Sequence, residues 1–201
     1  PMDTVIDDTN IQHFVGNTNI CLPRHVKYNV LTKVYNSSWM NDGCDSFFFS
    51  YGLDEIIELF ENGSKLPPRV LIDVANGHMQ KLYDISKRIK EKFGNDIELM
   101  VGNIANPNTY RKYCEIGVDY IRVGIGGGSA CTTSANVSIH FPMASLIDEC
   151  AKIKSEFDNP TKIIADGGFR NFSDIIKALA IGADYVMLGG ILNKSLESIF
   201  C

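Results

Sequence analysis

The sequence predicts an α/β protein whose parallel strands close into a (β/α)8 barrel, the TIM barrel. Short apolar runs alternate with helical patterns along the 201 residues. Several of these runs are apolar throughout, which is typical of parallel strands buried on both faces. The runs number eight, and eight strands favour closure into a barrel over an open doubly wound sheet.

The candidate strands are short and evenly distributed, and they lie at residues 2–5, 19–22, 46–50, 69–74, 97–101, 120–125, 162–165 and 185–188. Strand, helix and strand follow one another repeatedly. Such repetition implies right-handed crossovers and therefore a parallel sheet.

Four segments between these strands carry apolar residues at helical spacing, and they are 79–93, 108–116, 142–157 and 173–180. Pro107 marks the start of the second helix, because proline is tolerated in a first helical turn. Ser173 is the expected N-cap of the last helix, and Gly182 is its expected C-terminal stop.

We expect one domain, an incomplete catalytic barrel over residues 1–201. No low-complexity linker divides the chain. A typical barrel of this kind takes ~250 residues. The chain begins without an initiator methionine, within its first predicted strand, and stops before an eighth outer helix would finish. The sequence therefore reads as a barrel truncated at both ends.

Composition excludes several classes of partner and site. The net charge is −5, and no run of lysine and arginine indicates nucleic acid or a membrane surface. No apolar stretch approaches the ~20 residues of a membrane helix. The 6 cysteines are scattered without C-x-x-C spacing, and the 4 histidines lack H-x-x-x-H spacing. This pattern favours a reducing, cytoplasmic location over a disulfide framework or a zinc site.

Polar or glycine-rich segments follow five of the predicted strands, and they read DVANGH (73–78), GNIANP (102–107), GIGGGSACTT (124–133), ADGGFR (165–170) and LGGIL (188–192). In a barrel of parallel strands the carboxyl ends meet at one rim, where active sites are built. We therefore expect these five segments to surround the functional site.

Two glycine pairs occupy the positions where barrels commonly bind phosphate. The pair at 167–168 follows the seventh strand, and the pair at 189–190 follows the eighth. Bare backbone N–H groups can approach phosphate oxygens, although such glycines also make tight turns with no ligand. Ser129 offers a further hydrogen bond. Asp166 suits the two hydroxyls of a ribose, or else it caps a turn.

Cys131 ends a glycine-rich loop at this rim, where loop N–H groups favour its thiolate. It is a candidate nucleophile, although a lone cysteine is more often a small buried apolar residue. Cys150 lies on a helical stripe and is expected in the core. A Rossmann dinucleotide motif is rejected, because that fingerprint follows the first strand of its unit and these glycines follow the sixth.

Six segments in order give the chain a resemblance to the inosine-monophosphate dehydrogenase and guanosine-monophosphate reductase family. They are PMDTV (1–5), IDVANGH (72–78), VGN (101–103), VGIGGGSACTT (123–133), IADGGF (164–169) and GADYVMLGGIL (182–192). Within the family, DVANGH and MLGG resemble the reductase branch. The chain also lacks an insert resembling the paired nucleotide-sensing modules of the dehydrogenases.

The resemblance implies NADPH-dependent reductive deamination of GMP to IMP. Cys131 attacks purine C2 to give a covalent thioimidate, and Thr133 helps proton transfer to the leaving amine. The implied substrate-binding residues are Met2, Asn103, Ser129, Asp166, Gly167, Gly168, Gly189 and Gly190. The implied NADPH-binding residues are Asp73, Ala75, Asn76 and Gly77. Backbone carbonyls of Gly126, Gly128 and Cys131 match a monovalent-cation site, usually potassium, and the family usually forms homotetramers.

Two other readings stay open. One is an IMP dehydrogenase, which converts IMP to XMP with NAD. The other is a weakly active or inactive purine-nucleotide-binding remnant. The remnant is favoured by residues 134–143, where Met143 stands at a position usually held by glutamine. It is also favoured by the lack of the segment that carries the threonine's glutamate partner.

Overall fold

Seven parallel strands form one sheet in the computed structural model, which describes residue 14 and residues 18–25, 46–125 and 141–192. They are β1 (Ile20–Leu22), β2 (Phe47–Tyr51), β3 (Arg69–Asp73), β4 (Glu98–Ile104), β5 (Tyr120–Val123), β6 (Lys162–Asp166) and β7 (Tyr185–Met187). Each pairs in parallel with the next along the chain. The predicted strand at 2–5 lies outside the described residues.

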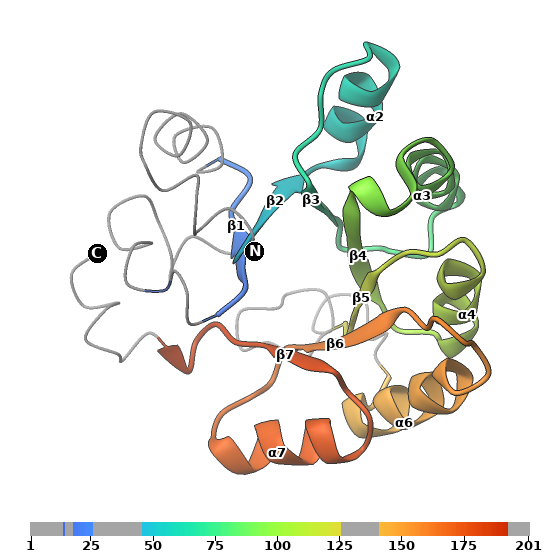
Figure 1. Cartoon of the computed structure of the whole chain (residues 1–201). Helices are drawn as coiled ribbons and strands as arrows, with labels where there is room; N and C mark the ends of the chain where they lie inside the picture. The colour runs from blue at the N-terminus through green and yellow to red at the C-terminus, as the bar shows by residue number, and fades with distance from the viewer. Residues whose placement is uncertain (1–13, 15–17, 26–45, 126–140, 193–201) are drawn as a thin grey trace.

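In the described ranges, five α-helices lie on the outer side of this sheet and follow one another around it (Figure 1). They are α2 (Leu53–Glu61), α3 (Gln80–Phe93), α4 (Pro107–Glu115), α6 (Met143–Lys154) and α7 (Phe172–Ala180), with a 3-10 turn η4 (Gly94–Asp96) after α3. Within the described part of the chain, none of these helices has the length and apolar character needed to cross a membrane.

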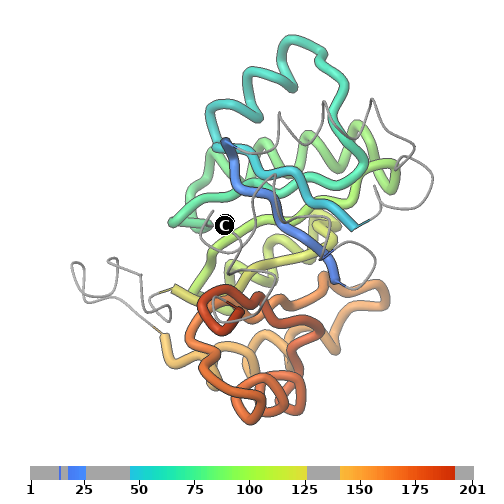
Figure 2. Tube along the Cα trace, turned by 90° about the vertical axis from the view of Figure 1, so that its left-hand side faces the viewer, coloured from blue at the N-terminus to red at the C-terminus, as the bar shows by residue number. Residues whose placement is uncertain are grey.

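The strand order confirms the predicted barrel class. A doubly wound sheet reverses its strand order at a switch point and carries helices on both faces. Here the order is β1 to β7 without reversal, and the helices lie on one side. In Figure 2 the blue tube of β1 runs beside the cyan tube of β2, as their pairing requires. The sheet is therefore an arc of a (β/α)8 barrel, with seven of its strands described.

Alternate residues along each strand supply two apolar cores. On β3, Val70 and Ile72 belong to the large cluster between sheet and helices, while Leu71 belongs to a smaller inner cluster. That inner cluster consists of Phe48, Leu71, Met100, Tyr120 and Ile164, with Cys21 and Met187 packed against it. Successive side chains of a strand point to opposite faces, so the inner cluster fills the concave side of the arc.

Helix α2 was not predicted, although its sequence carries a helical signal. Ile56 is fully buried, and the partly buried Leu53, Ile57 and Phe60 pack against the same core. These four residues recur at spacings of three, one and three, which places them on one helical face. In the sequence this signal does not stand out as a separate element, because the stretch directly follows the strongly apolar run of β2.

The predicted N-cap of α7 is wrong. Asn171, rather than Ser173, accepts the capping hydrogen bond, from the backbone N–H of Asp174 to its side-chain oxygen at 3.0 Å. Helix α7 therefore begins at Phe172, and Ser173 lies in its first turn. The predicted stop at Gly182 agrees with its φ of +118°, and an added Cβ there would lie 2.5 Å from Cβ of Ala151.

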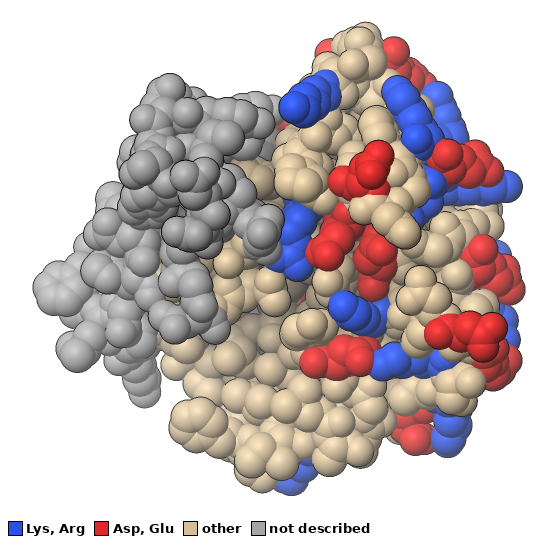
Figure 3. All heavy atoms as spheres, in the orientation of Figure 1, with Lys and Arg blue, Asp and Glu red and all other residues tan. Residues whose placement is uncertain are grey.

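Helix α7 also carries an apolar stripe toward solvent. Phe172, Ile176 and Leu179 are 79%, 65% and 43% exposed among the described residues. The space-filling view shows few charged side chains over this helix, whereas acidic and basic groups are interspersed over α2, α3 and α4 (Figure 3).

Candidate active site

The carboxyl ends of β3, β4 and β6 bring three predicted site residues to one rim. Asp73 is the last residue of β3, Asn103 lies near the end of β4, and Asp166 is the last residue of β6. The register pairs Asp73 with Gly102, and Gly102 in turn with Arg122 of β5. Residues that are far apart in sequence therefore lie at the same level of the barrel.

Arg122 is the centre of this arrangement, and it is only 6% exposed. Its Nη1 donates to Oδ1 of Asp73 at 2.5 Å, and its Nη2 donates to Oδ2 of Asp166 at 2.7 Å. Its Nε also lies within hydrogen-bond reach of Asp166 Oδ2, at 3.2 Å. One guanidinium thus joins carboxylates from two strands that are not neighbours in the sheet.

The electrostatics of the triad favour the charged forms. Burial opposes the charge on Arg122, but the carboxylates of Asp166 and Asp73 raise its pKa above the ordinary value. Burial would raise the pKa of Asp73, but nearby positive charges, with the Arg122 guanidinium first among them, together lower it below the ordinary value. The triad thus brings two carboxyl groups to one guanidinium. Hydrogen-bond donors of a ligand are attracted to such a group.

Asn103 connects this triad to the segment after β3. Its Nδ2 donates to Oδ2 of Asp166 at 2.7 Å and to the carbonyl oxygen of Gly124 at 2.9 Å. Its backbone N–H donates to Val74 at 2.7 Å, and its carbonyl accepts from the N–H of Gly77 at 2.7 Å. The side chain of Asn103 thus contacts Asp166, which is predicted to bind the nucleotide. Its backbone holds the segment after β3, which is predicted to bind the dinucleotide.

The predicted dinucleotide segment lies closely along β4. Ala75 and Asn76 are exposed, whereas Gly77 is buried. An added Cβ at Gly77 would lie 2.6 Å from the carbonyl oxygen of Asn103, so only glycine permits this approach. The hydroxyl of Tyr113 donates to the Gly77 carbonyl at 2.9 Å.

The two glycine pairs differ in conformation. Gly167 and Gly168 have φ values of +106° and +84°, which a residue with a side chain adopts only with strain. Their presence is explained by the turn after β6, whether or not a phosphate binds there. An added Cβ at Gly189 or Gly190 meets no described atom within 4 Å. The second pair therefore offers backbone that a ligand can approach.

Several predicted site residues lie outside the described residues, and their roles stay predictions. They are Met2, Gly126, Gly128, Ser129, Cys131 and Thr133. The proposed nucleophile, the proton-transfer threonine and the cation site all belong to this set.

Two of the cysteines that the structure describes, Cys150 and Cys21, are not activated thiols. Cys150 is fully buried on α6, as predicted, and burial raises its pKa to about 12. Burial likewise raises the pKa of Cys21 to about 11, and its Sγ lies 4.0 Å from Sδ of Met100. In the described ranges no three His, Cys, Asp or Glu side chains gather as metal ligands.

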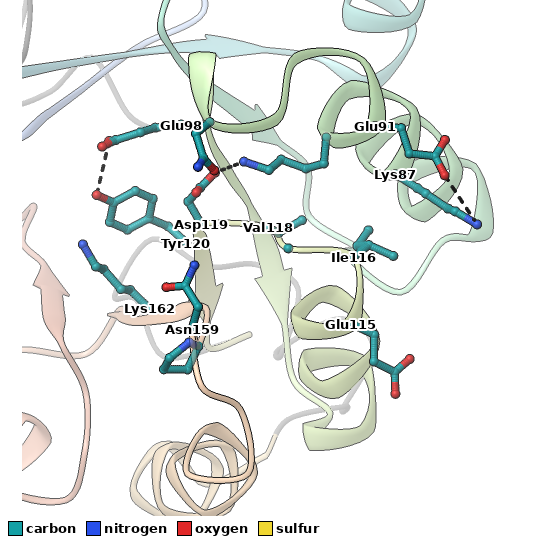
Figure 4. A pocket seen from close by; sticks show the side chains of 14 residues that line it. Lys87, Glu91, Glu98, Glu115, Ile116, Val118, Asp119, Tyr120, Asn159 and Lys162 are labelled. Atoms are coloured by element: carbon teal, nitrogen blue, oxygen red, sulfur yellow. Dashed lines mark hydrogen bonds and ion pairs between the residues drawn. The ribbon is translucent and has the colours of Figure 1, made fainter.

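A pocket of about 490 Å³ lies at the opposite end of the strands, around the first residues of β4, β5 and β6. Several of its charged groups pair with one another (Figure 4). Lys90 pairs with Asp119 at 2.8 Å, and the Tyr120 hydroxyl donates to Glu98 at 3.2 Å. In barrels of this class the amino-terminal face serves stability, so the buried triad rather than this cavity marks the functional end.

Comparison with known proteins agrees with the geometry. A family model described as IMP dehydrogenase / GMP reductase domain matches residues 56–199. Inosine-5'-monophosphate dehydrogenase of Chlorobaculum parvum is 43% identical over 129 residues, which are 64% of this chain and 26% of that protein. The protein of the same name from Methanocaldococcus jannaschii is 42% identical over 130 residues, 64% of this chain and 26% of that protein. The one from Cryptosporidium parvum is 41% identical over 129 residues, 64% of this chain and 31% of that protein.

The chain thus spans about a quarter to a third of the length of the curated relatives it matches. The family match covers most of the chain and includes Asp73, Asn103, Arg122 and Asp166. The chain belongs to the IMP dehydrogenase / GMP reductase family.

Proposed function

We propose that this chain carries the purine-nucleotide and dinucleotide sites of an IMP dehydrogenase, which oxidises IMP to XMP with NAD⁺. The observation that carries the proposal is the convergence of Asp73, Asn103 and Asp166 on buried Arg122 at one rim. The relatives named above favour the dehydrogenase, since each is an IMP dehydrogenase.

Asp166 has the geometry to receive a ribose. The described residues that donate to it, Arg122 and Asn103, use Oδ2, and none of them donates to Oδ1. That oxygen is therefore free of described donors and can accept a ribose hydroxyl. The backbone after β6 and the open glycine pair at 189–190 then lie on the side where the 5'-phosphate would bind.

The residues after β3 fit a dinucleotide. Asp73 has a lowered pKa and stays ionised, so it can accept hydrogen bonds from ribose hydroxyls. Ala75 and Asn76 are exposed beside it and can contact the nicotinamide end. When bound, NAD⁺ supplies an acceptor for hydride. The chain's part is to hold that acceptor against the purine and to exclude water during transfer.

Cys131 and Thr133 are the proposed chemical groups. The Cys131 thiolate adds to C2 of IMP, and the hydrogen on C2 leaves as hydride. The resulting thioimidate is then hydrolysed: water adds to C2, the C2–S bond breaks, and XMP departs with the thiol regenerated. Thr133 takes part in proton transfer to or from water. Carbonyls of Gly126, Gly128 and Cys131 would hold a potassium ion beside the loop.

GMP reductase, with NADPH as hydride donor, is the second candidate. The observation that favours it is the segment DVANGH at 73–78, which resembles the reductase branch. The dehydrogenase reduces its nicotinamide cofactor, whereas the reductase oxidises it. One spectroscopic experiment therefore distinguishes the two activities.

Absorbance at about 340 nm should rise when the chain is mixed with IMP and NAD⁺, because NADH forms. A fall with GMP and NADPH would instead establish the reductase. Cys131→Ala is the matched control, since it should abolish the change while IMP binding stays measurable by calorimetry. Binding of IMP without turnover in either mixture would contradict the catalytic part and support the nucleotide-binding remnant.

A further inference from the structure

The imidazole of His78 joins the segment after β3 to the start of α4. Its Nε2 accepts a hydrogen bond from the backbone N–H of Ala105 at 3.1 Å. Its Nδ1 lies 2.8 Å from Oγ1 of Thr109. A nitrogen that accepts an N–H bond carries no proton, so the ring is neutral and its proton is on Nδ1, donated to the Thr109 hydroxyl.

Residues 74–78 are held along β4 at both of their ends. At the near end the Val74 N–H donates to the Gly102 carbonyl at 2.9 Å. At the far end the Gly77 N–H donates to the Asn103 carbonyl at 2.7 Å, and the His78 side chain adds the contact to α4. The exposed Ala75 and Asn76 lie between these two sets of contacts. The contacts of Gly77 and His78 therefore help to fix the position and orientation of Ala75 and Asn76.

We propose that His78 is a positioning residue for the dinucleotide, whose neutral ring fixes residues 74–78 against the first turn of α4. The proposal rests on the proposed function, because it assigns this segment to the dinucleotide. His78 does not need to touch the ligand. It acts through the backbone that carries Asp73, Ala75 and Asn76.

The surroundings favour the neutral ring that this role requires. Burial lowers the pKa of His78. The ring also lies at the amino-terminal end of α4, just before its N-cap Asn106, where the helix dipole opposes a positive charge. Burial raises the pKa of the neighbouring Tyr113, which therefore stays neutral.

In the parts of β3, α3 and α4 that lie nearest His78 along the chain, the charged side chains are Asp73, Lys81, Asp84, Arg111, Lys112 and Glu115. None of them forms an ion pair with His78 in the part of the chain that the structure describes. Arg111 pairs instead with Glu156, and Lys81 with Asp54. Protonation of His78 would thus remove an acceptor and add a charge that no described side chain neutralises.

The test compares His78→Leu with His78→Gln in the full chain. Leucine removes the acceptor, whereas the glutamine side-chain oxygen can still accept from Ala105 and does not titrate. At about pH 7.5, His78→Leu should raise the Kd for NAD⁺ about five- to tenfold and change the Kd for IMP less than about twofold. His78→Gln should restore NAD⁺ binding to within about threefold. It should also remove the weakening of NAD⁺ binding that the proposal predicts for the wild type toward about pH 5.5.

Amide hydrogen exchange at Gly77 and Ala105 provides a readout without ligand. Exchange should be about tenfold faster in His78→Leu and near the wild-type rate in His78→Gln. Unchanged exchange, a proton on Nε2 in the imidazole nitrogen spectrum, or equal weakening of NAD⁺ and IMP would overturn the positioning role. Failure of the wild type to bind NAD⁺ would instead overturn the proposed function, and with it the dinucleotide role of the His78 contacts. The exchange rates would still show whether His78 holds residues 74–78 against α4.

Discussion

Gly102 of β4 faces Arg122 of β5 so closely that an added Cβ would lie 2.5 Å from Cβ of Arg122 and 2.8 Å from its carbonyl oxygen. Real Cβ atoms do not approach other heavy atoms so closely. The missing side chain on β4 is therefore what allows a large cationic side chain to enter the barrel from the neighbouring strand. The buried triad depends on this pair.

Gly102→Ala should consequently destabilise the protein by about 2–3 kcal/mol, because the overpacked backbone of β5 has to shift. Urea denaturation followed by circular dichroism measures the change. Gly189→Ala is the control, since its Cβ meets no described atom within 4 Å and its cost should stay within about 0.5 kcal/mol. Equal stability of the two variants would show that β5 accommodates the methyl group.

Arg122→Met should cost about 3–5 kcal/mol of stability, because it removes the guanidinium from beside two carboxylates inside the barrel. Adding Asp166→Asn should recover part of this loss, with a coupling energy of about 0.5–3 kcal/mol between the two sites. The control is Arg111→Met, which removes a half-exposed, solvent-screened ion pair with Glu156 and should change stability far less. Strict additivity of the Arg122 and Asp166 substitutions would contradict the coupling.

The ion pair of Asp73 should make stability fall at acid pH. The pKa of Asp73 is lowered in the folded protein, so the unfolded chain binds its proton first as pH falls. The contribution is complete above the unfolded pKa of about 3.9 and is lost as pH falls through the lower folded pKa. Urea midpoints measured from about pH 6 to pH 2 should therefore decline less steeply for Asp73→Asn than for the wild type. Parallel curves would argue against this pairing.

Gly190→Val tests whether the glycine pair at 189–190 binds phosphate or only forms a turn. The site has room for the side chain among the described atoms, so stability should change by less than about 0.5 kcal/mol. The Kd for IMP should nevertheless rise about tenfold or more, while the Kd for inosine, which lacks the phosphate, should stay within about twofold. Calorimetric titration of both ligands gives the comparison. Equal losses for both would indicate that this backbone does not approach a phosphate.

Local patterns predicted most elements of the fold, since apolar runs and cap residues are visible in a short window. The strands at 69–74 and 162–165 were predicted within one residue of β3 and β6. The cap of α7 was misplaced because Asn171 and Ser173 are both good caps, and only the backbone conformation distinguishes them. Residues near 131 and the first predicted strand lie outside the described residues, so those predictions stand untested.

Arg122 is the residue that sequence reasoning missed. The sequence presents it as one arginine within an apolar strand, and a lone charged residue usually lies at the surface. Its importance comes from strand register, which sets it level with Gly102 and between the strands that carry Asp73 and Asp166. Register is a non-local property, and no spacing rule along one strand predicts it. One feature of the sequence does point to Arg122: it is a charged residue flanked by apolar neighbours in 120–125, a stretch predicted to be buried.

Asn103 has a consequence for anyone redesigning this protein. Its side-chain amide is hydrogen-bonded to Asp166, while its backbone is hydrogen-bonded to Val74 and Gly77. A library that varies residues 74–77 to exchange one coenzyme for another will also shift the Asn103 amide that holds Asp166, the residue proposed to bind the ribose. Coenzyme preference and substrate affinity should therefore change together. Successful variants will be those whose new loop leaves the backbone of Asn103 in its present position.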